Sequence, residues 1–209
     1  MGRASVCITA AALAGAAWCG AAARGGVITY TYDATVTNVV GGGPYGMTAT
    51  VGQAVQGSFG YDSNTPDQSP SPLFGHYSGD PVGAYTMNFA SGDYVIDSFF
   101  DIFITLDVTV PFDEMEIYTS TNVYVNGVMQ PGAEMYMQFR DDTATIFPTD
   151  ALPPDTLTIN DFNLSWGYIR DVVSGQRVDF AVTYLHGVPA PASLCAVGAG
   201  LMLVGRRRR

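Results

Sequence analysis

Apolar and polar residues alternate through most of the stretch Phe100-Asp101-Ile102-Phe103-Ile104-Thr105-Leu106-Asp107-Val108-Thr109-Val110. Every even-numbered position in it is apolar, whereas four of the five odd-numbered positions are Asp or Thr. A period of two places successive side chains on opposite faces of an extended chain. The stretch therefore predicts a β-strand with one face in a core and the other in water.

The same period recurs on both sides of this stretch. Alternating segments occupy residues 27–40, 55–62, 85–89, 135–140, 162–168 and 177–184. In the last two segments, the pattern predicts that two sets of side chains face the core. These sets are Phe162, Leu164, Trp166 and Tyr168, and Val178, Phe180, Val182 and Tyr184.

Turn signals separate the predicted strands. Asn126-Gly127, between two short apolar segments, predicts a tight β-hairpin. Residues 62–81 and 147–155 are rich in Pro, Ser or Asp and are expected to be loops, and no segment keeps a helical period. We expect seven to nine antiparallel strands and an all-β fold, a β-sandwich of jelly-roll or immunoglobulin-like type. A closed barrel is the alternative.

The N-terminus has the features of a secretory signal peptide. Arg3 precedes an apolar, alanine-rich run that ends in small residues at Ala21-Ala22-Ala23. A positive end, an apolar segment and a small-residue cleavage site define such signals. Residues 1–23 are therefore predicted to be removed on export.

The C-terminus predicts a short transmembrane helix. Fourteen uncharged residues, Ala192 to Gly205, precede the cluster Arg206-Arg207-Arg208-Arg209. At about 1.5 Å per residue this segment spans about 21 Å, which is shorter than the hydrocarbon core of about 30 Å. Arginine side chains that extend to the lipid headgroups reduce this difference in length. The arginines oppose translocation, so the chain before Val188 is expected to lie outside the cytoplasm.

Pro189-Ala190-Pro191, the apolar segment and the terminal arginines together resemble the PEP-CTERM sorting signal of Gram-negative bacteria. In that family, Val-Pro-Glu-Pro precedes a membrane helix and an arginine cluster, and the membrane transpeptidase exosortase cuts near the prolines. Pro189 and Pro191 match the two prolines, whereas Ala190 replaces the usual Glu. The resemblance implies that residues 188–209 sort the protein, by transient anchoring in the inner membrane, to the cell surface or the extracellular medium.

Residues 24–187 are then expected to form one acidic ectodomain. Between Arg24 and Pro191, four arginines and no lysine oppose all nineteen acidic residues, which gives a net charge of −15. Such a charge excludes nucleic acid as a partner. The three cysteines, Cys7, Cys19 and Cys195, lie in the sorting segments, so the ectodomain has no disulfide to stabilise it.

Candidates for catalysis and metal binding are few. Glu114 and Glu116 are predicted to share one face of a strand, a spacing of about 7 Å that suits acid–base chemistry on a glycosidic bond. The loops holding His76 and His186 show no nucleophile motif. Calcium is the one cofactor considered, at Asp141-Asp142 or at residues 62–67, and for residues 62–67 an Asx turn explains the same side chains. No catalytic, cofactor or metal residue is assigned.

Three functional hypotheses follow. The first, which we adopt, is a non-enzymatic structural or adhesive protein of the cell surface or extracellular matrix. Its partners are signal peptidase and exosortase during export, and exopolysaccharide afterwards. The second is a carbohydrate-binding β-sandwich, with exposed rings to be found among Tyr85, Tyr94, Tyr118, Tyr124 and Tyr136. The third is a glycoside hydrolase that uses Glu114 and Glu116.

Overall fold

The computed structural model describes residues 26–78, 84–107 and 112–188. The predicted signal peptide and the predicted sorting residues, Pro189, Ala190, Pro191 and Arg206 to Arg209, lie outside these ranges. Two 3-10 helices, η1 (Pro44–Gly46) and η2 (Ile159–Asp161), are the helices within them. Across the described ranges, no helix has the length and apolar character needed to cross a membrane.

Twelve strands account for most of the described chain. The first six are β1 (Val27–Val40), β2 (Ala54–Asp62), β3 (Phe74–Tyr77), β4 (Tyr85–Phe89), β5 (Tyr94–Asp97) and β6 (Asp101–Asp107). The other six are β7 (Phe112–Thr119), β8 (Tyr124–Val125), β9 (Val128–Met129), β10 (Ala133–Asp141), β11 (Leu164–Asp171) and β12 (Arg177–Val188). The prediction of an all-β fold is confirmed.

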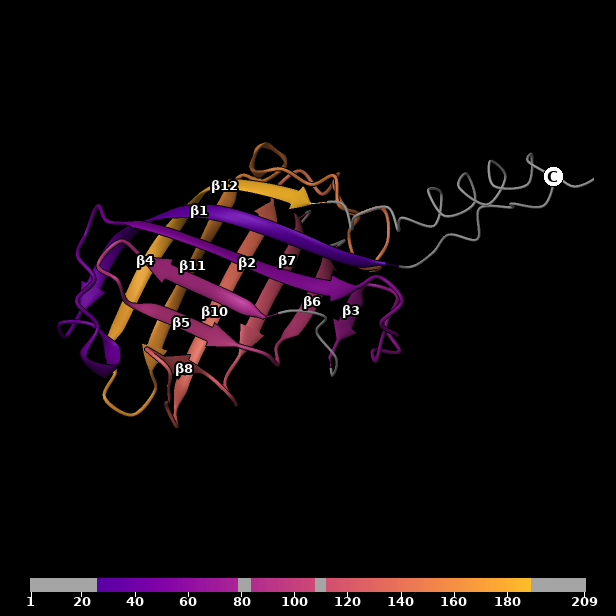
Figure 1. The fold of residues 1–209 in the computed structure, drawn as a ribbon. Helices are drawn as coiled ribbons and strands as arrows, with labels where there is room; N and C mark the ends of the chain where they lie inside the picture. The colour runs from indigo at the N-terminus through magenta and orange to yellow at the C-terminus, as the bar shows by residue number, and fades with distance from the viewer. Residues whose placement is uncertain (1–25, 79–83, 108–111, 189–209) are drawn as a thin grey trace, which may run out of the picture.

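The strands form one curled antiparallel sheet in the order β3-β6-β7-β10-β11-β12-β1-β2-β4-β5-β8-β9. Figure 1 shows β1, β2, β4 and β5 crossing in front of β6, β7, β10 and β11. We call these two groups of strands the first layer and the second layer. Ring centroids of Phe59 in the first and Phe139 in the second lie 6.4 Å apart, so the core fills the space between the layers.

Alternation places the core side chains as predicted in several strands. Tyr30, Tyr32, Ala34 and Val36 of β1 are buried, as are Met135, Met137 and Phe139 of β10. Ile102 and Ile104 are buried in β6, which is formed by most of the alternating stretch that begins at Phe100. Burial of these apolar faces is the main force that holds the two layers together.

Strand β11 corrects one prediction. Trp166 and Tyr168 pair in register with Gln138 and Tyr136 of β10 on the outer side of the second layer, away from the core cluster; Trp166 is half-buried there and Tyr168 is 8% exposed. Their neighbours Ser165, Gly167 and Ile169 face inward instead. Gly167 explains the reversal, because a Cβ at this position would lie 2.5 Å from the Phe180 ring. Only glycine leaves room for that ring, so the bulky neighbours point outward.

Strand β12 corrects a second one. Its pairing with β1 shifts by one residue between Asp33 and Ala34, which marks a β-bulge near Thr183. Val178, Phe180 and Val182 are buried as predicted, but the bulge reverses the alternation after them. Tyr184 therefore lies on the outer surface, paired with Asp33 and 47% exposed.

The turns and loops agree in part with the sequence. Asn126 and Gly127 both have positive φ between β8 and β9, which confirms the hairpin. The predicted loop 62–81 contains the short strand β3, which pairs with β6. The predicted loop 147–155 has no strand, and the Tyr30 and Tyr61 hydroxyls fix it by donating to the carbonyls of Pro154 and Pro153.

Candidate functional site

The outer surface of the second layer brings together four of the sequence candidates, Glu114, Glu116, Tyr118 and Tyr136. Glu114 and Glu116 alternate with the buried Met115 and Ile117 on β7, so they share a face as predicted. In register, Glu116 is followed across the sheet by Gln138 of β10 and then by Trp166 of β11. We call this surface the Trp166 face, formed by Glu114, Glu116, Tyr118, Tyr136, Gln138, Trp166 and Tyr168.

Three aromatic rings cluster at the centre of the Trp166 face. Tyr136 stacks on Tyr168 with a centroid distance of 5.2 Å, and Trp166 lies 5.4 Å from Tyr136. The Arg177 guanidinium covers Tyr168 at 4.2 Å from the ring centroid. Tyr136 and Trp166 are half-buried, so each keeps part of its ring in contact with solvent.

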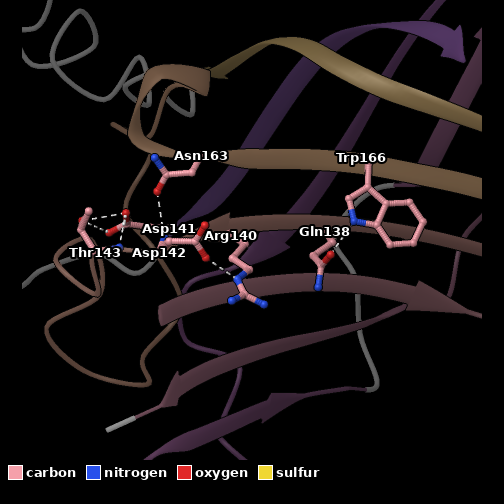
Figure 2. A network of polar contacts seen from close by, with 7 residues as sticks. All are labelled: Gln138, Arg140, Asp141, Asp142, Thr143, Asn163 and Trp166. Carbon is pink, nitrogen blue, oxygen red and sulfur yellow. Dashed lines mark hydrogen bonds and ion pairs between the residues drawn. The ribbon is translucent and has the colours of Figure 1, made fainter. Parts of the chain in front are cut away.

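Hydrogen bonds fix these rings against polar side chains of neighbouring strands. The Trp166 indole N–H donates to Oε1 of Gln138, as Figure 2 shows, and the Tyr136 hydroxyl donates to Glu116. The Tyr168 hydroxyl donates to Glu134, whose other oxygen accepts from Arg170 at 2.9 Å. Buried and half-buried polar groups held in this way keep one orientation. The face is a rigid surface of rings, carboxyls and an amide.

The two glutamates are electrostatically coupled. Burial raises the pKa of Glu114 above its ordinary value, and a hydrogen bond from Gln138 partly offsets this rise. The nearby carboxylate of Glu116 raises the pKa of Glu114 further, because a second negative charge disfavours ionisation of the first carboxyl group.

The edge of the same layer holds Asp141 and Asp142, one of the two calcium candidates. Figure 2 shows Asp142 beside Arg140 and Asn163, and the Arg140 Nε–Asp142 Oδ1 distance is 2.6 Å. Asp141 accepts hydrogen bonds from the backbone and hydroxyl groups of Thr143 and Thr145. These oxygens therefore close a turn.

The other calcium candidate is similar. Asp62 accepts from the backbone and side chain of Asn64, and Asp67 accepts from the backbone of Ser69 and His76. In the described ranges, no group of three or more His, Cys, Asp or Glu side chains is arranged to hold a metal ion. Calcium binding stays a prediction without a defined site.

The remaining candidates are dispersed. His76 of β3 stacks on Phe103 at 4.7 Å and lies 3.5 Å from Asp101, next to the Trp166 face, whereas His186 is exposed on β12 beside Tyr184. Of the five candidate tyrosines, Tyr118 and Tyr136 belong to the Trp166 face. Tyr85 is fully buried in the core, and Tyr94 and Tyr124 are exposed on β5 and β8.

Sequence reasoning missed Gln138, Trp166 and Tyr168 as members of this surface. The available signal was Gly167, because a glycine between bulky residues in a strand indicates a close approach by another group. Comparisons with protein-family models, with curated proteins and with solved structures found no match to this chain.

Proposed function

We propose that this chain is an exported, non-enzymatic surface or matrix protein that binds neutral polysaccharide through the Trp166 face. Its curled sheet would be a β-sandwich of the kind expected above. The sequence features of residues 1–23 and 188–209 support export and sorting, with signal peptidase and exosortase as transient partners. The exopolysaccharide of the producing cell is the proposed ligand.

The observation that carries the proposal is the cluster of Tyr136 and Trp166 beside Glu116 and Gln138. Aromatic rings offer a flat apolar surface on which the C–H face of a sugar ring can lie. Contact between two aromatic rings, a comparable arrangement, contributes about 0.5–1.5 kcal/mol beyond the burial of apolar area. Carboxylate and amide oxygens beside the rings accept hydrogen bonds from sugar hydroxyls, and the amide N–H groups donate to them. Both kinds of group lie on adjacent strands of this face.

The charge of the domain favours a neutral ligand. A net charge of −15 between Arg24 and Pro191 repels uronic-acid polymers, and the Trp166 face itself carries Glu114 and Glu116. The three arginines near the face are engaged with carboxylates, because Arg140, Arg170 and Arg177 pair with Asp142, Glu134 and Asp179. Neutral hexose polymers are therefore the expected class.

The same geometry gives little support to the hydrolase hypothesis. Glycosidases need both carboxyl groups accessible to the sugar, one to protonate the leaving oxygen and one to attack the sugar or activate a water molecule. Glu114 is only 8% exposed, and Glu116 already accepts a hydrogen bond from the Tyr136 hydroxyl.

The test is native electrophoresis of the full-length protein in gels that contain a polysaccharide. We expect neutral β-glucan, galactomannan or dextran to retard the wild type, and alginate to leave its mobility unchanged. Trp166→Ala should weaken binding about tenfold, which corresponds to about 1.4 kcal/mol. Tyr124→Ala, which removes an exposed ring from β8, is the matched control.

Two results would overturn the proposal: no retardation by any neutral polymer, or equal retardation of the wild type and Trp166→Ala. Melting temperatures of all variants identify any loss that is due to unfolding. Release of reducing ends by the wild type, abolished in Glu116→Gln, would instead establish the hydrolase.

A further inference from the structure

A polar groove lies on the opposite surface of the molecule, on the outer side of the first layer. Its volume is about 400 Å³, and it runs across β12, β1, β2 and β4. Figure 1 shows β1, β2 and β4 side by side on the side that faces the viewer. We call it the Gln56 groove, with Asp33, Gln56, Ser58, Thr86, Asn88 and Tyr184 among its lining residues.

Hydrogen bonds order the floor of the Gln56 groove. Gln56 Nε2 donates to Asp33 Oδ1 at 2.9 Å, and Asn88 Nδ2 donates to the Gln56 carbonyl at 3.3 Å. The Ser58 and Thr86 hydroxyls are 3.0 Å apart. An amide side chain has two donor hydrogens and an acceptor oxygen, so one bond leaves most of its capacity for a ligand.

Tyr184 supplies an aromatic wall at one end of the groove. The bulge in β12 turns its ring outward, and Asp33 is its partner in register on β1. The register continues from Asp33 of β1 to Gln56 of β2 and from Gln56 to Asn88 of β4, across two further strands. With strands about 4.8 Å apart, the row from Tyr184 to Asn88 extends about 14 Å.

We propose that the Gln56 groove is a second binding site, and that its ligand is a neutral oligosaccharide segment. Hydroxyl and amide groups that both donate and accept match the hydroxyls of a sugar, and the Tyr184 ring can stack on a sugar face. An anionic ligand would meet the Asp33 carboxylate with no cation among the lining residues. The groove is therefore matched to uncharged sugars.

The second site gives the protein a bridging role. The Gln56 groove and the Trp166 face lie on the outer surfaces of two layers that share one core, so they point away from each other. One molecule then binds two polysaccharide chains at once and cross-links them. The proposal that the Gln56 groove binds sugar does not depend on the Trp166 face, whereas the bridging role rests on the proposed function of that face.

The experiment separates the two sites with variants of the full-length protein in the same polysaccharide gels. The Trp166→Ala variant should still be retarded by the polymer. Adding Tyr184→Ala or Asn88→Ala to this variant should reduce its retardation at least threefold, whereas adding Tyr184→Phe should leave the retardation unchanged. Thr37→Ala, an exposed threonine of β1 outside the groove, is the control. Tyr184 and Asn88 are exposed, so their replacement should leave the melting temperature unchanged, and thermal unfolding of each variant measures this.

Bridging is measured with beads that carry the polymer which retards the wild type. The wild type should capture a fluorescent soluble form of that polymer onto the beads, whereas Trp166→Ala and Tyr184→Ala should bind the beads without capturing it. The groove proposal is overturned if Trp166→Ala is not retarded at all, or if Tyr184→Ala and Asn88→Ala leave its retardation unchanged. Retardation abolished by Tyr184→Ala but unaffected by Trp166→Ala would keep the groove and remove the Trp166 face.

Discussion

Gly57 of β2 lies beneath the Gln56 groove at a point where the packing admits no side chain. A Cβ there would lie 2.1 Å from the Thr86 carbonyl oxygen and 2.3 Å from Cζ of Tyr32. Tyr32 is 1% exposed, and its hydroxyl donates to the same carbonyl at 2.7 Å. Gly57→Ala must therefore displace both the ring and a backbone group.

The expected loss of stability is about 3 kcal/mol. Forcing an extra methyl group into a well-packed core costs about 1–3 kcal/mol. Breaking the Tyr32–Thr86 hydrogen bond costs about 1 kcal/mol or more, because the hydroxyl stays buried. The lower entropy of the unfolded chain with alanine offsets about 0.4–1 kcal/mol of this. For a domain of this size, about 3 kcal/mol corresponds to a fall in Tm of about 6–12 °C.

Thermal unfolding followed by circular dichroism measures this difference. Gly46→Ala is the control, because Gly46 has φ of +73° but no atom within 4 Å of the added Cβ, and it should cost only about 1–2 kcal/mol of backbone strain. In a Tyr32→Leu background, Gly57→Ala should cost less than in the wild type, since one of the two clashes is removed. An unchanged or higher Tm for Gly57→Ala would refute the close packing beneath the groove.

Two other predictions concern buried carboxyl groups. Because burial and Glu116 raise the pKa of Glu114, its charge destabilises the folded state above that pKa, and Glu114→Gln should stabilise the protein at pH 7. Urea midpoints should show this gain fading as the pH falls towards 4.5, the ordinary pKa of the group, and an equal gain at pH 4 and pH 7 would contradict the electrostatic cause. Asp113 is 3% exposed, and its Oδ2 accepts from the backbone N–H groups of Ile146 and Phe147 at 3.0 and 2.9 Å. Asp113→Ala should cost about 2–4 kcal/mol in the same assay and Asp113→Asn less, because Asn retains an acceptor; equal costs would show that these two hydrogen bonds are not the reason.

The sequence by itself determined the strand content, one face of most strands and the surface charge. Alternation correctly assigned the core residues of β1, β6 and β10, and Asn126-Gly127 correctly located a hairpin. It also placed Glu114 and Glu116 on one face, since residues two apart along a strand must share a side. These features are local, so a window of a few residues contains the information that fixes them.

Only the tertiary structure decided which side chains form the two proposed binding surfaces. Trp166 points outward because Phe180, on the neighbouring strand, fills the space beside Gly167. Tyr184 points outward because a bulge in the pairing of β12 with β1 reverses the alternation. Both depend on contacts between strands, and a period of two along one strand contains no information on what its neighbour occupies or where an extra residue enters the pairing.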